Sequence, residues 1–193
     1  MSIVRKILSN CLVALSILST AALADWKVDS EQSKVFFIST KNLNISEVHS
    51  FSRIDGQLSS DGQFSADISL SSVETGIDIR NQRMREMLFK VDLFPKANIS
   101  ATLPKAIMSL AKGESMHTEL PATLTLMGAS KALNLDLIVS KTNDGKYMVS
   151  SAKPVLLGAS ELGLQDGVEA LQKIAGLTSI GLTVPVTFNL VLN

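Results

Sequence analysis

The last stretch of the chain constrains the fold most, because an apolar residue recurs at every second position. The residues in this series are Leu182, Val184, Val186, Phe188, Leu190 and Leu192. A period of two puts all of them on one face of an extended strand. Similar alternation covers residues 64–70, 97–103, 120–126 and 133–139, and it resumes at 147. Strands with one apolar face must pack on each other, so the sequence predicts an all-β, antiparallel sandwich or barrel of about eight strands.

Two segments depart from this pattern and have helical spacing instead. Apolar residues recur at roughly helical intervals within 79–88, a segment that also carries three arginines. Residues 166–175 have one apolar face, and Gly176 follows as a stop signal. We therefore predict two short helices, the first of which plugs or covers one end of a closed sheet.

The first 24 residues have the three parts of a secretory signal. Arg5 and Lys6 supply the positive charge, an apolar run extends to Leu23, and residues 22–24 have the A-x-A form of a cleavage site. We predict a signal peptide over 1–24 and one exported domain over 25–193 that does not span the membrane. Cleavage would remove Cys11, the only cysteine, which excludes disulfides and thiolate chemistry in the mature domain.

Charge and motifs exclude several functional classes. Loss of Arg5 and Lys6 from a balanced 18 basic and 18 acidic residues leaves 16 against 18, which is unfavourable for nucleic-acid binding. The chain lacks the G-x-S-x-G, G-x-x-x-x-G-K-(S/T) and G-x-G-x-x-G motifs, and two separated histidines do not make a zinc site. We therefore predict no catalytic residue, no metal and no built-in cofactor.

Small aliphatic residues dominate the predicted inward face, which can either fill a barrel or wall a tunnel. A barrel of about eight strands is just wide enough to hold one small ligand. Periodicity does not separate the two cases, and packing considerations alone favour a filled barrel. The predicted wall consists of Phe36, Ile38, Phe64, Ile68, Leu124, Leu135, Leu137, Val184, Val186 and Phe188.

Four polar residues are candidates for contacts with the head group of a ligand. Arg80 and Arg83 carry guanidinium groups that can donate two hydrogen bonds to a diphosphate, a carboxylate or a quinone oxygen. Asn81 lies between them, and His49 belongs to an apolar strand. Each also has a structural alternative: an ion pair for either arginine, a stabilised turn for Asn81, and a hydrogen bond inside the barrel for His49.

Three blocks of sequence carry motifs in a fixed order along the chain. The block from Thr75 to Phe89 has the pattern T-G-x-x-x-R-N, with Phe94-Pro95 after it. The other two blocks are residues 41–56, which end at Gly56, and residues 120–131, which contain the run L-T-L-M-G. Together the blocks resemble the YceI-like family: residues 41–56 are similar to its early strand pair, and residues 120–131 to its G-x-L-T-(L/M)-x-G hairpin without the first glycine. The family's late R-(S/T)-x-(F/W)-G segment is missing, and residues 157–163 stand in its place.

The resemblance implies an antiparallel, lipocalin-like β-barrel in the periplasm, with a hydrophobic tunnel for a polyisoprenoid or another long apolar chain. It favours a hollow barrel and a non-enzymatic carrier of a long-chain isoprenoid lipid, including a quinone. Two alternatives stay open: an accessory redox or lipid-modifying enzyme that acts on a bound quinone or lipid, and a filled-barrel interaction module without a ligand. The candidate protein partners are a membrane cytochrome and a second copy of the chain.

Overall fold

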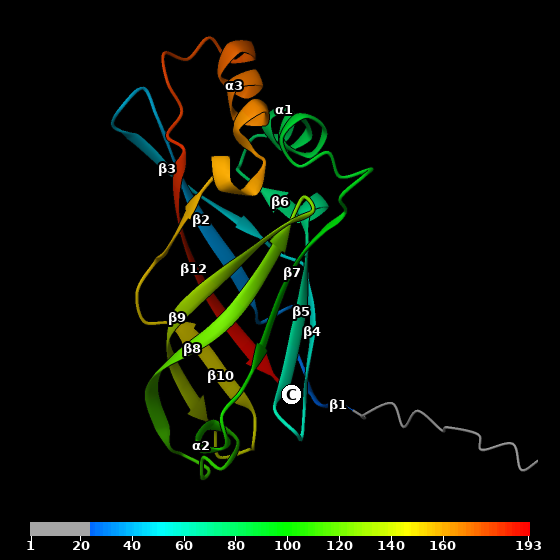
Figure 1. Ribbon diagram of the computed structural model, residues 1–193, viewed down its shortest axis with the longest axis vertical. Coiled ribbons are helices and arrows are strands. Elements are labelled where there is room, and N and C mark those ends of the chain that lie inside the picture. The colour runs from blue at the N-terminus through cyan, green and yellow to red at the C-terminus, as the bar shows by residue number, and fades with distance from the viewer. Residues whose placement is uncertain (1–23) are drawn as a thin grey trace, which may run out of the picture.

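A computed structural model describes residues 24–193, which form one curled antiparallel sheet with short helices at its ends (Figure 1). The strands pair in the order β1-β4-β5-β7-β8-β9-β10-β12-β2-β3-β6, and β11 pairs with β12 alone. Their bounds are β1 Ala24–Lys27, β2 Lys34–Lys41, β3 Ile45–Phe51, β4 Ile54–Ser59, β5 Gln63–Ser69, β6 Val73–Glu74, β7 Lys96–Thr102, β8 Ser115–Leu126, β9 Ala129–Lys141, β10 Tyr147–Ser151, β11 Val155–Gly158 and β12 Thr183–Leu192.

The first strand closes the sheet into a barrel. β1 pairs with β4 on one side, while the backbones of Lys27 and Asn193 exchange two hydrogen bonds of 2.8 Å on the other. Val28 and Leu192 form an isolated bridge beside them. The predicted antiparallel, lipocalin-like barrel is confirmed. The expected count of about eight strands is too low, because the two to four residues of β1, β6 and β11 are too few to show a period of two.

Both predicted helices are present, and they lie together at one end of the barrel (Figure 1). α1 (Asp78–Arg83) continues directly into a π-helical turn, Met84–Leu88, against which α3 (Gln165–Ile174) packs. Gly167 allows this approach, since a Cβ there would lie 2.8 Å from the Leu88 Cα. A third helix, α2 (Lys105–Met108), covers the opposite end and was not predicted, because four residues give no measurable helical period.

Beneath α1 and α3 the barrel is filled with side chains. Phe51 stacks on Phe37 with ring centroids 5.3 Å apart and also contacts Phe89 at 5.6 Å. The other buried side chains at this end include Leu70, Val73, Met84, Leu88, Leu162 and Val168. The helices therefore form a solid plug, as the sequence predicted for residues 79–88.

The expected inward face of β2 is wrong by one residue. Val35 and Phe37 point into the barrel, so Phe36 and Ile38 lie on the opposite face of the strand. Residues 35–38 are all apolar and carry no period-two signal; only the pairing with β3 and β12 fixes which of them face inward.

Within residues 24–193 no helix has the length and apolar character needed to cross a lipid bilayer. The predicted signal peptide lies outside the described residues, except for Ala24.

Candidate ligand-binding cavity

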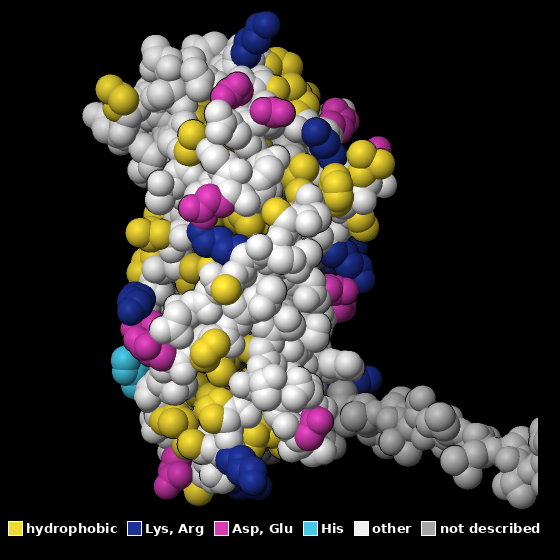
Figure 2. Space-filling view, in the orientation of Figure 1, with side chains coloured by type: hydrophobic (Ala, Val, Ile, Leu, Met, Phe, Trp, Pro, Cys, Tyr) yellow, Lys and Arg dark blue, Asp and Glu magenta, His cyan; other side chains and the backbone are white. Residues whose placement is uncertain are grey.

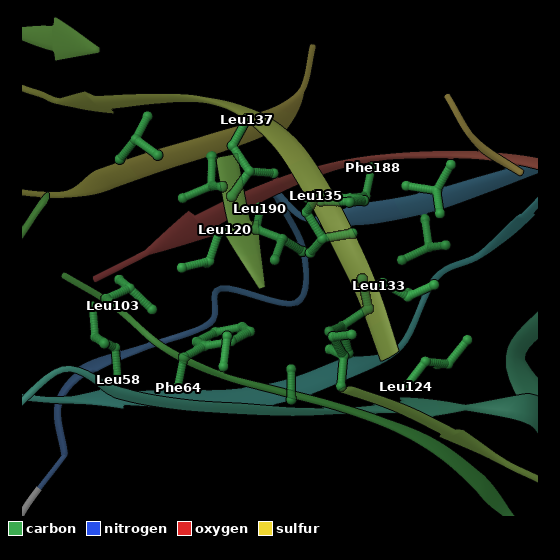
Figure 3. Close-up of a pocket in the computed structure, with 18 of the residues that line it drawn as sticks. Leu58, Phe64, Leu103, Leu120, Leu124, Leu133, Leu135, Leu137, Phe188 and Leu190 are labelled. Carbon is green, nitrogen blue, oxygen red and sulfur yellow. The ribbon is translucent and has the colours of Figure 1, made fainter. Parts of the chain in front are cut away.

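An apolar cavity of about 150 Å³ occupies the middle of the barrel, between the plug and α2. Its wall consists of 24 side chains from β2, β4, β5 and β7–β12, with Leu103 and Ile107 at the α2 end. Leucine, valine, isoleucine, phenylalanine and alanine supply all but one of them. Figure 3 shows side chains from opposite strands, such as Phe64, Leu135 and Leu190, pointing into this common space. A cavity with this lining favours hydrocarbon, because it offers no hydrogen-bond partner to a polar ligand.

Tyr147 is the one lining residue with a polar group, and that group is already bonded. Its hydroxyl donates to the Met108 carbonyl at 3.2 Å and accepts from the Lys141 ammonium at 3.3 Å. Trp26 packs edge-on against the tyrosine ring with centroids 5.2 Å apart. The ring therefore adds apolar wall, while its hydroxyl has partners outside the cavity.

Seven of the ten predicted wall residues line this cavity. They are Phe64, Ile68, Leu124, Leu135, Leu137, Val186 and Phe188. Val184 packs against the core without lining the cavity, and Phe36 and Ile38 face away from it for the reason given above.

The predicted head-group residues lie at the plug end, and none of them lines the cavity. Arg80 places Nη1 2.8 Å from the Glu47 carboxylate and donates from Nη2 to the Thr75 carbonyl at 2.6 Å. Lys41 binds the same Glu47 oxygen at 2.8 Å. The Lys41 hydrogen bond, followed by Arg80, holds the pKa of Glu47 below its usual value. Arg80 is thus an ion-pair partner that ties α1 to β3.

Asn81 is buried in the middle of α1 and bonds to the residues that precede the helix. Its side-chain oxygen accepts hydrogen bonds from the Thr75 amide at 2.9 Å and from the Thr75 hydroxyl at 2.6 Å. Its amide nitrogen donates to Glu74 at 3.1 Å. These bonds fix the turn that leads into the helix. Arg83 follows on the same helix and is half-buried.

His49 is buried on β3, with only 4% of its surface exposed. Its Nε2 lies 2.8 Å from the Ser39 hydroxyl, and its ring contacts Phe37. Burial lowers the pKa of His49, with a further contribution from the charge of Arg80, so the neutral ring is favoured at pH 7. Across residues 24–193, no three histidine or acidic side chains gather in a way that could hold a metal ion.

The sequence of this barrel matches the family model of the YceI-like domain over residues 26–192. The chain belongs to the YceI-like family. A solved polyisoprenoid binding domain from Saccharophagus degradans, implicated in plant cell wall breakdown, is 34% identical over 88% of this chain and 98% of its own, with a TM-score of 0.85. Burkholderia cenocepacia BcnA shares the fold, with a TM-score of 0.65 and 18% identity over 85% of this chain and 98% of its own. No curated protein sequence matches the chain.

Several cavity residues of this YceI-like domain were missing from the predicted wall. Ile54 and Leu58 are four residues apart with Gly56 between them, and the surrounding sequence is irregular, so their strand gave a weak signal. Val155 and Leu157 belong to a strand of four residues, and Ile107 belongs to the short helix α2. The only local signal for Ile54 and Leu58 is that both are apolar and lie on the same side of an extended strand; the inward orientation of the other three depends on tertiary contacts.

Proposed function

We propose that this YceI-like domain binds one long-chain isoprenoid lipid, with the hydrocarbon tail in the central cavity, and carries it through the periplasm without altering it. The observation that supports this most is the lining, in which 24 side chains present hydrocarbon and the one hydroxyl is bonded elsewhere. The polyisoprenoid-binding neighbour at 34% identity supports the same class of ligand.

The energetics favour binding through the tail. Burial is worth about 0.8 kcal/mol per methylene, so each carbon of the tail that enters the cavity adds about that much to the affinity, before the cost of ordering the chain is subtracted. The predicted head-group residues are therefore secondary in this proposal, and the bonds of Arg80 and Asn81 favour their structural alternatives.

The size of the cavity adds one requirement. A volume of about 150 Å³ is typical of a space that holds a single aromatic ring. A long tail must therefore displace leucine side chains that line the cavity, or leave part of its length outside. We propose that the end of the tail occupies the cavity and that leucine rotamers make room for it.

A quinone is one head group that fits this proposal, because the tail rather than the head supplies the affinity. Turnover of a bound quinone or lipid would need a reactive group beside it, and Tyr147 carries the only polar atom among the lining side chains. Delivery to a membrane cytochrome and pairing with a second copy of the chain stay predictions.

Lipid retention by three variants tests the proposal. Organic extraction of protein purified from the periplasm, followed by mass spectrometry, detects a co-purified lipid. Native mass spectrometry of the delipidated protein after addition of nonaprenol then detects the complex by its mass. Val186→Asp puts a charge into the apolar wall and should abolish retention, as should Leu135→Asp. Asn189→Asp adds the same charge to an exposed site on β12 and should leave retention intact.

Arg80→Ala should weaken retention less than Val186→Asp does, because the tail dominates the affinity. Val186→Thr, which keeps the shape of the side chain, replaces Val186→Asp if circular dichroism shows that the charged variant does not fold. Equal retention by Val186→Asp and Asn189→Asp would contradict a tail in this cavity. If the wild-type protein takes up no nonaprenol, the filled-barrel interaction module is favoured instead.

A further inference from the structure

The barrel wall has a gap between β9 and β11. β9 pairs with β10 only as far as Leu137 and Ser151, and the last backbone hydrogen bond runs from the Ala152 amide to the Asp136 carbonyl at 2.8 Å. Beyond it, residues 129–135 of β9 pair with β8 alone, and β11 pairs with β12 alone, among the residues that the structure describes. In Figure 1 the yellow-green β9 slants away from the yellow-orange segment that contains β11.

The central cavity reaches this gap from the inside. Leu133 and Leu135 of β9 and Val155 and Leu157 of β11 all line the cavity. On the outside, a depression of about 290 Å³ lies over the same gap. Leu133 and Val155 belong to both the cavity and the depression. At this point the barrel wall is therefore one layer of side chains, with no backbone ladder behind it.

Ion pairs instead of strand pairing connect the two edges. Lys131 on β9 contacts Glu161, which follows β11 in a 3₁₀ turn (Ser160–Leu162). At the other end of the gap Lys153 binds Asp136 at 2.9 Å. The Glu161 side chain is 62% exposed. An ion pair as exposed as this favours its closed state over its open state by a factor of only about one to five. They can open without breaking any backbone hydrogen bond.

The outer depression has a mixed lining, with apolar side chains beside Asn134, Asp136 and Lys153. Pro154 and Leu156 form part of its lining, and the Leu156 side chain is largely exposed. On the face shown in Figure 2, hydrophobic side chains likewise stand among basic and acidic ones. The two ends of the barrel are less open, since the plug fills one and α2 covers the other with Ile107, which is 1% exposed.

We propose that an isoprenoid chain enters and leaves the cavity sideways, through the gap between β9 and β11. Leu133 and Val155 rotate apart to admit the chain, and the Lys131–Glu161 pair is a latch across the opening. This inference rests on the proposed function, because it concerns the route of the same ligand. Elsewhere around the cavity, neighbouring strands share backbone hydrogen bonds, whose loss inside the barrel would leave polar groups unpaired.

Cross-linking the gap tests the route. Lys131→Cys and Glu161→Cys are combined with Cys11→Ser, so that the two new thiols are the only ones in the chain. A short bismaleimide joins them, and stopped-flow fluorescence follows uptake and release of nitrobenzoxadiazole-labelled geranylgeraniol. The cross-link should slow both rates at least about tenfold while leaving their ratio unchanged, because it raises the barrier without altering the site. The same protein before cross-linking is the reference.

A second cross-link controls for general stiffening of the barrel. Thr125→Cys and Ser130→Cys replace a facing pair at the β8–β9 turn whose side-chain oxygens lie 3.0 Å apart. Joining them should leave the exchange rates unchanged. In the opposite direction, Lys131→Glu places a second carboxylate beside Glu161 and should speed exchange about two- to fivefold.

The outcomes separate the two proposals. If wild-type protein does not bind the labelled probe, the proposed function fails and the lateral route fails with it. If the probe binds and the protein cross-linked between residues 131 and 161 exchanges it as fast as the control cross-link, only the lateral route is overturned. If cross-linking disturbs folding, the Lys131→Glu variant provides the test instead. An exchange rate in Lys131→Glu equal to that of the wild-type protein also overturns the route.

Discussion

Two leucines with the same exposure should differ in what their removal costs, because only one of them faces the cavity. Leu58 and Leu162 are each 1% exposed. Leu58 lines the cavity on β4, whereas Leu162 belongs to the buried core at the plug end and does not line the cavity. Leu58→Ala and Leu162→Ala therefore remove the same atoms from a hollow site and from a filled one.

The size of the difference depends on what surrounds each side chain. Both variants lose the transfer free energy of the removed atoms, about 2 kcal/mol. Leu162→Ala also leaves a new void, and at about 24 cal/mol per Å³ a void of about 100 Å³ adds about 2.4 kcal/mol. Leu58 already lacks partners on its cavity side, so we expect about half of that second contribution. The free energy of unfolding should fall by about 3 kcal/mol for Leu58→Ala and by about 4–5 kcal/mol for Leu162→Ala.

Urea unfolding of delipidated protein measures this difference. Trp26, the only tryptophan, packs against Tyr147 and reports the transition by fluorescence. Addition of nonaprenol supplies a second readout, because Leu58→Ala changes the volume of the cavity and should change lipid binding, whereas Leu162→Ala should not. Equal costs for the two variants in the delipidated protein, or a larger cost for Leu58→Ala, would refute a hollow centre.

Three further predictions concern the frame around the cavity. Asn81→Ala should lower the free energy of unfolding by about 2–4 kcal/mol in chemical denaturation, because it leaves buried hydrogen-bond donors unpaired. Gly56→Ala places a Cβ 2.7 Å from a side chain of β5, so thermal unfolding should show a loss of about 1–3 kcal/mol. The Asn98 hydrogen bond, followed by Lys96, holds the pKa of Asp67 below its usual value; the resulting stability is present above about pH 4 and lost as the pH falls through the folded pKa. The unfolding free energy of Asp67→Asn should accordingly depend less steeply on pH below about 4.

The alternation of β12 shows what could be predicted from the sequence. Val186, Phe188, Leu190 and Leu192 line the cavity as their period of two predicts. The signal is strong there because polar residues separate most of the apolar ones. β2 lacks such separation, since residues 35–38 are all apolar, and its inward face depends on pairing with strands distant in the sequence.

The polar candidates were harder to interpret for a related reason. An ion pair was the structural alternative expected for Arg80, but the sequence did not indicate its partner, Glu47, which lies 33 residues away on β3. Long-range partners of this kind are fixed by the packing of the plug, which no local pattern encodes.

The plug and the gap in the wall are connected through the same part of the chain. β11 pairs with β12 and not with β9, and the chain then continues through the 3₁₀ turn into α3, which packs on the π-helical turn after α1. The segment that contributes α3 to the plug is therefore the same segment that leaves an edge of β9 unpaired. In the proposed route, a lipid that cannot pass the plug enters along this unpaired edge.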